Sequence, residues 1–183
     1  MKKNQLFIIT LLISSISFAC SCNETLNFFK GAKIADKVIL GKIINREFKV
    51  DDGTKLSDSD KLEKHFADNK GKVFYYVEIL TVEIIETIKG KKEKNTVEIY
   101  GGNFDSCWSS LSYLKINEFY IISIFETINP LEFGQSVHNN IGYELGACQN
   151  SSLSIDSDLN KVKGFLRNEK KTITYRKLKR KIT

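Results

Sequence analysis

Short runs of apolar residues separated by polar turns predict a protein made mostly of β-strands. β-Branched and aromatic side chains dominate these runs, and several runs alternate with polar residues, as in strands with one buried face. The five predicted strands cover residues 38–44, 73–88, 97–100, 120–125 and 143–145. Gly41 in the first run, and a slip in the alternation of the second, indicate bulges that bend these strands.

Three segments depart from this pattern. Residues 25–29 suggest a short helical or irregular lead-in, and residues 51–71 are so polar that we expect a long hairpin loop with at most a short helix near 61–66. Toward the C-terminus, Ser157 or Asp158 is the expected cap of another helix. The apolar residues of that helix would be Leu159, Val162, Phe165 and Leu166.

Bulged antiparallel strands, a long hairpin and a late helix fit an all-β fold with minor helix. The specific expectation is an OB-like five-stranded Greek-key barrel with a C-terminal helix. A β-sandwich is the alternative, but the number of strands and the bend at Gly41 favour the barrel. Residues 20–150 would form this domain, and residues 151–183 the C-terminal helix and a basic tail.

The first 19 residues have the anatomy of a secretory signal peptide. Lys2 and Lys3 precede an apolar run, and the small residues Ser17 and Ala19 suit cleavage before Cys20. Because the run is shorter than the roughly 20 residues of a transmembrane helix, we expect a secreted or extracytoplasmic protein without a retained transmembrane anchor. Cys20 would become either a free N-terminus or a lipid-modified one, and both fates remain open.

The positive charge of the chain is concentrated near its C-terminus. The formal net charge is +6, yet residues 161–181 hold ten Lys or Arg and one acid, Glu169. The rest of the exported chain is therefore mildly acidic, and no nucleic-acid partner is expected. Residues 172–183 have few apolar side chains, so we expect a frayed tail whose charge could contact an anionic membrane surface.

The four cysteines, Cys20, Cys22, Cys107 and Cys148, all follow the signal peptide. An even number of cysteines in an oxidising compartment predicts two disulfides. A bond between Cys20 and Cys22 would close too tight a ring. Each of these two must then bond to Cys107 or Cys148, and either pairing clamps the mature N-terminus to two distant parts of the chain.

Catalytic and metal-binding motifs receive little support from the sequence. Cys-x-Cys is one residue too short for the usual zinc spacing, and His65 and His138 both fall in predicted loops. Neither Gly-x-Ser-x-Gly nor His-Glu-x-x-His occurs. We therefore expect no enzyme activity, no cofactor and no metal ion of the protein's own. Trp108, beside Cys107, is expected in the core rather than in a partner contact.

Several segments, taken in order, resemble the N-terminal domain of the tissue inhibitors of metalloproteinases (TIMPs). They begin with Cys20-Ser21-Cys22 and Phe28-Phe29, and they continue through residues 35–39, 89–90, 97–100, Cys107 and 118–122. The resemblance covers roughly residues 20–148 and extends to the netrin-like group, whose members share the fold without all inhibiting proteases. The chain lacks the cysteine that the family carries near the position of Phe29, which suggests a divergent or bacterial relative.

The resemblance implies a secreted inhibitor of zinc metalloproteases. The free amine and carbonyl of Cys20 would chelate the catalytic zinc of the protease, and Ser21, Cys22 and Asn23 would contact its specificity pocket. A catalytic zinc keeps an open position for such a ligand, and an α-amine with a pKa of about 7.7–8.0 is neutral for a useful fraction of the time. The alternative is a non-inhibitory cell-surface lipoprotein or adhesion module on the same scaffold.

The resemblance also implies that Cys20 pairs with Cys107 and Cys22 with Cys148. We therefore predict no free thiol in the exported protein, which peptide mapping without reduction will check. Disulfides that close loops of this length stabilise by roughly 4 kcal/mol each in the chain-entropy model, so a Cys22→Ala, Cys148→Ala variant should melt far below the parent. A bond between Cys20 and Cys148 would contradict the implied pairing.

Overall fold

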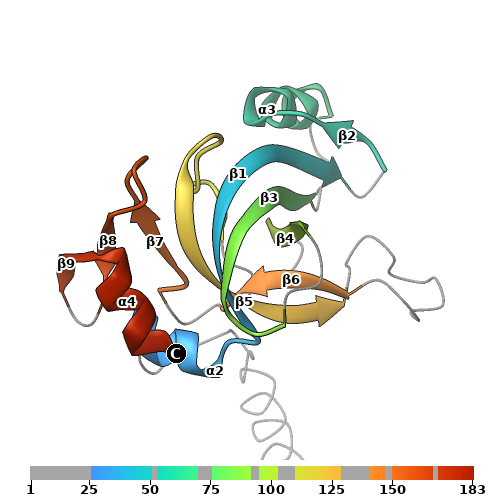
Figure 1. The fold of residues 1–183 in the computed structure, drawn as a ribbon. Helices are drawn as coiled ribbons and strands as arrows, with labels where there is room; N and C mark the ends of the chain where they lie inside the picture. The colour runs from blue at the N-terminus through green and yellow to red at the C-terminus, as the bar shows by residue number, and fades with distance from the viewer. Residues whose placement is uncertain are drawn as a thin grey trace, which may run out of the picture.

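Nine strands in one mixed sheet and three helices make up the part of the protein that the structure describes (Figure 1). The computed structural model describes residues 26–50, 53–69, 76–91, 95–102, 110–128, 141–146, 150–166 and 169–183. The strands are β1 (Lys37–Val50), β2 (Lys55–Leu56), β3 (Tyr76–Lys89), β4 (Thr96–Gly102), β5 (Phe119–Ile128), β6 (Ile141–Leu145), β7 (Ser152–Ile155), β8 (Lys161–Phe165) and β9 (Lys170–Thr174). The helices are α2 (Phe28–Ile34), α3 (Ser59–Asp68) and α4 (Tyr175–Ile182).

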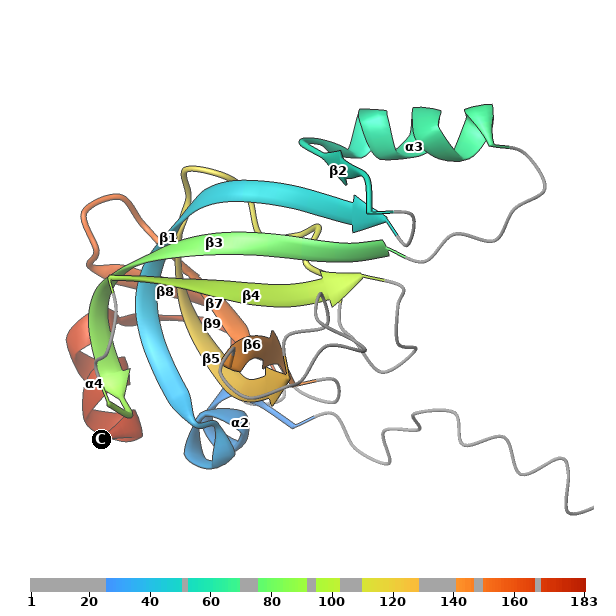
Figure 2. The same cartoon turned by 90° about the vertical axis from the view of Figure 1, so that its right-hand side faces the viewer.

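Five strands of the sheet close into a ring in the order β1-β3-β4-β6-β5, because β1 pairs with both β3 and β5 (Figure 2). The ring strands are those that the sequence pattern predicts, and each of the five is confirmed. Neighbouring strands in the ring are antiparallel except β4 and β6, which are parallel. The remaining strands extend the sheet beyond the ring, β2 on one side and β7, β8 and β9 on the other.

The bulges expected from the sequence bend the long β1–β3 pair. The register shifts between Leu40 and Gly41, and again between Ile43 and Asn45. At Gly41 the backbone of β1 approaches β3 so closely that a Cβ atom would collide with the side chain of Val82. Glycine is needed at this position because no larger side chain leaves room for the bend.

Two apolar cores lie on opposite faces of β1 and β5. Because both faces of these strands are buried there, apolar residues follow one another in the sequence instead of alternating with polar ones. The inner core fills the ring, and Ile39, Ile43 and Ile122 belong to it. The outer core lies between these strands and the surrounding elements. Its fully buried or nearly fully buried members include Phe28, Val38, Leu40, Ile121, Leu153, Val162 and Leu178.

The prediction of a helix through Leu159, Val162, Phe165 and Leu166 is wrong. Asp156 accepts hydrogen bonds from the backbone N–H groups of Asn160 (2.6 Å) and Lys161 (3.0 Å), which makes a tight turn between β7 and β8. Past this turn Val162 is buried between two exposed lysines, as in a strand. The polar–apolar alternation of residues 161–163 therefore outweighs the helical spacing.

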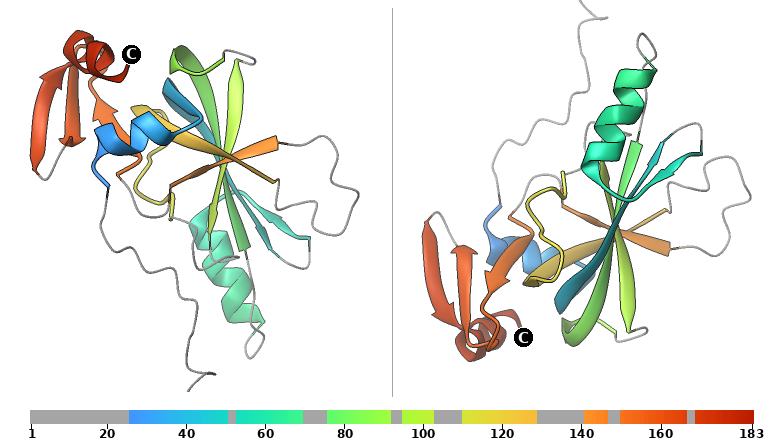
Figure 3. Two further views of the ribbon diagram at one scale, coloured as in Figure 1. Left: turned by 90° about the horizontal axis from the view of Figure 1, so that it is seen from below. Right: turned by 90° about the horizontal axis from the view of Figure 1, so that it is seen from above.

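The expectation of a frayed basic tail is also wrong, because the last residues form β9 and α4. The Thr174 side chain accepts a hydrogen bond from the Lys177 backbone N–H and caps α4. Tyr175, Leu178 and Ile182 then pack on the outer core, with Leu178 fully buried. Figure 3 shows β8, β9 and α4 together on one side of the ring.

The polar segment before β3 contains a longer helix than expected. Asp58 caps α3 by accepting a hydrogen bond of 2.8 Å from the backbone N–H of Lys61. Leu62 and Phe66 pack against Phe48 at the end of β1. His65 consequently lies on a helix rather than in a loop.

We predict that Leu178→Ala destabilises the protein by about 2–4 kcal/mol, because it deletes a fully buried side chain from the outer core. The neighbouring Lys177→Ala is the matched control, since Lys177 is exposed. Denaturant unfolding of both variants will check this. Equal stability of the two point variants would contradict the observed packing of α4. Truncation after Glu169, which removes β9 and α4, should likewise lower the melting temperature by many degrees.

Candidate functional site

The residues that the sequence predicts for the protease contact and the disulfides lie outside the described part of the chain. They are Cys20, Ser21, Cys22, Asn23, Cys107 and Cys148. Trp108 and His138 lie outside it as well. The described residues that flank these positions nevertheless define where the three cysteine-bearing segments join the fold.

The N-terminal segment joins the fold beside the segment that carries Cys148. The backbone N–H of Asn150 donates a hydrogen bond of 3.0 Å to the carbonyl of Leu26. Cys22 precedes Leu26 by four positions, and Cys148 precedes Asn150 by two. The described residues that follow Cys22 and Cys148 in the sequence are therefore bonded to each other.

The segment that follows Cys107 is held at the end of the ring by a buried ion pair. Glu78 of β3 is 3% exposed, and its carboxylate lies 3.1 Å from Nε of Arg46 on β1. The carboxylate also accepts a hydrogen bond of 3.1 Å from the backbone N–H of Leu111. Arg46 donates to the carbonyls of Leu111 and Leu114, so both charged groups hold the same short segment.

Burial raises the pKa of Glu78, although the Leu111 N–H and the positive charge of Arg46 act in the opposite direction. The cost of burying this carboxylate is thus offset only in part by its partners. We infer that its role is to position the segment after Cys107 rather than to add stability.

The same segment approaches the place where the N-terminus enters. The hydroxyl of Tyr113 interacts with the side chain of Ser152, two residues beyond the Asn150 that bonds to Leu26. The described flanks of Cys22 and Cys148 therefore meet just before β7, and Ser152, the first residue of β7, acts on the hydroxyl of Tyr113. Such convergence is what a clamped N-terminus requires.

Helix α2 follows directly and is fixed at both of its ends. The Asn27 side chain caps it by accepting a hydrogen bond of 3.1 Å from the Lys30 backbone N–H. At its C-terminal end, Nζ of Lys89 on β3 donates to the carbonyls of Ala32 (3.1 Å), Lys33 (2.7 Å) and Ala35 (2.7 Å). A cation at this end complements the partial negative charge of the helix terminus.

Helix α4 is held near α2 by a polar contact with the ring. Glu86 of β3 accepts a hydrogen bond of 2.7 Å from the Tyr175 hydroxyl and another from Nζ of Lys179. Burial would raise the pKa of Glu86, but the hydrogen bonds from Lys179 and Tyr175 outweigh it and hold the pKa below its ordinary value. Burial, with the Glu86 carboxylate, raises the pKa of Tyr175, so its hydroxyl stays protonated.

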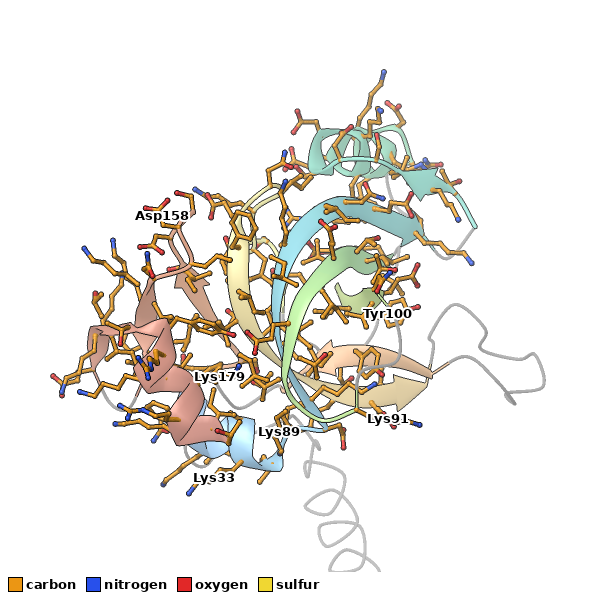
Figure 4. All side chains as sticks on the ribbon, in the orientation of Figure 1. Lys33, Lys89, Lys91, Tyr100, Asp158 and Lys179 are labelled. Atoms are coloured by element: carbon orange, nitrogen blue, oxygen red, sulfur yellow. The ribbon has the colours of Figure 1, made fainter. Side chains whose placement is uncertain are left out.

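Between the two helices lies a shallow basic pocket of about 380 Å³. We define the α2–α4 surface by its lining residues, Asn27, Phe29, Lys30, Lys33 and Lys181. Nζ of Lys181 lies 5.3 Å from the ring centroid of Phe29, a cation–π contact between α4 and α2. Figure 4 shows Lys33 on α2 and Lys179 on α4 at the same end of the molecule.

The sequence pattern missed this surface for an identifiable reason. Its C-terminal half depends on α4, where Tyr175, Leu178 and Ile182 recur at a spacing of three and four residues. That spacing is the signal of an amphipathic helix. The density of lysine and arginine around these residues made the segment resemble a solvated tail.

No family model matches the chain, and no curated protein or solved structure matches it. Within the described ranges, no helix combines the length and apolar character needed to cross a bilayer. The same ranges hold no group of three or more His, Cys, Asp or Glu side chains suited to a metal ion.

We predict that Glu86→Gln destabilises the protein by about 0.5–1 kcal/mol at neutral pH, the usual range for a partly exposed ion pair. Because the pKa of Glu86 is lowered by folding, its contribution is full above the ordinary value of 4.5 and is lost as the pH falls through the folded value. Parent and variant should therefore unfold alike at strongly acidic pH. Denaturant titrations across the acid range will measure this, with the exposed Glu63→Gln as the control. A difference that persists unchanged at acidic pH would contradict the assignment.

Proposed function

We propose that the protein is a secreted inhibitor of zinc metalloproteases that acts through its mature N-terminus. The observation that carries this proposal is the hydrogen bond between Asn150 and Leu26, which joins the chain after Cys148 to the chain after Cys22. Two disulfides at that place would hold Cys20 at one end of the ring as a fixed projection. The proposed pairs are Cys20 with Cys107 and Cys22 with Cys148.

The ring supports the proposal at the level of the fold. Its order β1-β3-β4-β6-β5 returns the fourth strand, β5, to lie beside the first. We infer from this order that the ring is an OB-type Greek-key barrel, the scaffold on which the resembling family carries its inhibitory terminus. A scaffold alone does not define a function, so the proposed inhibition depends on the chemistry of the terminus.

The chemistry of the terminus suits a catalytic zinc. The amine and carbonyl of Cys20 would form a five-membered chelate at the position that water normally occupies. Ser21 is small enough to enter the adjoining pocket, and Cys22 and Asn23 would line its rim. Disulfides that fix this segment before binding reduce the entropy lost on association.

A lipid-anchored surface protein is the second candidate function. It is favoured by the basic α2–α4 surface, which lies at the end of the fold where the N-terminal segment enters. Acylation of Cys20 would exclude chelation by its amine. The intact mass of the mature protein from its native host separates the two, since acyl chains add a large and characteristic increment.

We predict that one additional Ala before Cys20 abolishes inhibition of every secreted zinc metalloprotease that the mature protein inhibits. The extension converts the α-amine into an amide nitrogen, which is a poor zinc ligand, and places a residue where the metal must lie. Inhibition constants measured on a protease panel provide the test. One additional Ala after Thr183 is the matched control and should inhibit like the parent.

Disulfide content and melting temperature should be the same for both extended proteins. Replacement of Ser21 by a bulky residue should change which proteases are inhibited without unfolding the domain. Inhibition by the N-terminally extended protein at parental strength would eliminate the chelation mechanism, and lack of inhibition by all forms would favour the surface-protein function.

A further inference from the structure

We propose that the α2–α4 surface binds anionic phospholipid bilayers, with Lys30, Lys33 and Lys181 at the headgroups and Ile34 in the interface. This activity is separate from the proposed inhibition of proteases. It uses residues of the folded domain and does not depend on the chemical state of Cys20.

The charge of the surface is available for a ligand. Helices α2 and α4 contain no acidic residue, and five of the eight residues of α4 are Lys or Arg. Lys179 is engaged by Glu86, and Lys89 by the carbonyls at the end of α2. Between described residues, by contrast, no ion pair involves Lys30, Lys33 or Lys181.

Apolar side chains accompany these charges, which favours a bilayer over a purely ionic partner. Lys30, Lys33 and Ile34 are all exposed and stand three and four positions apart, so they share one face of α2. Ile34 is 62% exposed, and the half-buried Phe29 lines the pocket together with Lys30 and Lys33. Basic residues mixed with exposed apolar ones are typical of helices that lie in the membrane interface.

The α2–α4 surface is rigid before it binds, because buried side chains hold both helices on the outer core. Phe28 and Ala32 anchor α2 in the outer core, and Leu178 anchors α4. The contact of Lys181 with the Phe29 ring joins the two helices directly. Little side-chain and backbone freedom is therefore lost when the surface meets a membrane.

The expected affinity is modest and depends on salt. Each Lys or Arg near an anionic leaflet improves partitioning on the order of five-fold, and the attraction falls off within a Debye length. Three lysines together thus give roughly a hundred-fold preference for anionic over neutral vesicles at low ionic strength. Such reversible binding would concentrate the protein at a cell surface without anchoring it.

Vesicle co-sedimentation of the unacylated, disulfide-bonded mature chain provides the test. The vesicles are pure phosphatidylcholine or equal parts of phosphatidylcholine and phosphatidylglycerol, each at low and high salt. The variant Lys30→Glu, Lys33→Glu, Lys181→Glu should lose the preference for anionic vesicles. The matched control, Lys55→Glu, Lys64→Glu, Lys115→Glu, alters three other exposed lysines and has the same net charge. It should retain most of the binding.

Ile34→Ser tests the apolar contribution at unchanged charge and should weaken binding several-fold. Melting curves will show that each variant is folded. Binding of the parent to neutral and anionic vesicles alike, or an equal loss in both triple variants, would overturn the proposal. Binding to a soluble sulfated polysaccharide but not to anionic vesicles would overturn it as well. Inhibition is assayed without vesicles, so failure of one proposal leaves the other unaffected.

Discussion

The double pairing of β1 is the constraint on which the rest of the fold depends. Over residues 37–42 this strand is hydrogen-bonded to β5 on one side, while β3 pairs with it on the other side along almost its whole length. A strand held at both edges must bend for the sheet to close, and Gly41 with its register shift supplies that bend. Closure then buries one face of β1 inside the ring and leaves the opposite face to the outer core.

The outer core links the scaffold to both proposed functions. It holds α2, at the start of the described chain, and α4, at its end, in contact with each other, so two distant segments share one surface. The lysines around the pocket lie together only because Phe28 and Leu178 are buried beneath them. The site where the N-terminus enters and the basic surface consequently occupy neighbouring parts of the molecule.

The ring could be predicted from the sequence because its strands carry strong local signals. Alternating or continuous β-branched runs mark all five strands, and Gly41 marks a bend that the register confirms. The C-terminal elements could not be predicted as readily. Residues 159–166 carry both a helical spacing and a short extended alternation, and the Asp156 turn favours the extended form. In α4, lysine and arginine surround the apolar residues Tyr175, Leu178 and Ile182, so the segment resembled a solvated tail. These three residues meet the apolar surface that they pack against only in the folded protein.

The parallel β4–β6 pair has a consequence for motion within the ring. Two residue pairs join these strands, Ile99 with Tyr143 and Tyr100 with Glu144, whereas twelve join β1 to β3. Local openings of a native protein start where the fewest contacts must be broken. Amide hydrogens along this junction would therefore exchange with solvent through a small opening rather than through global unfolding, and the ring would loosen there while β1 and its partners remain protected.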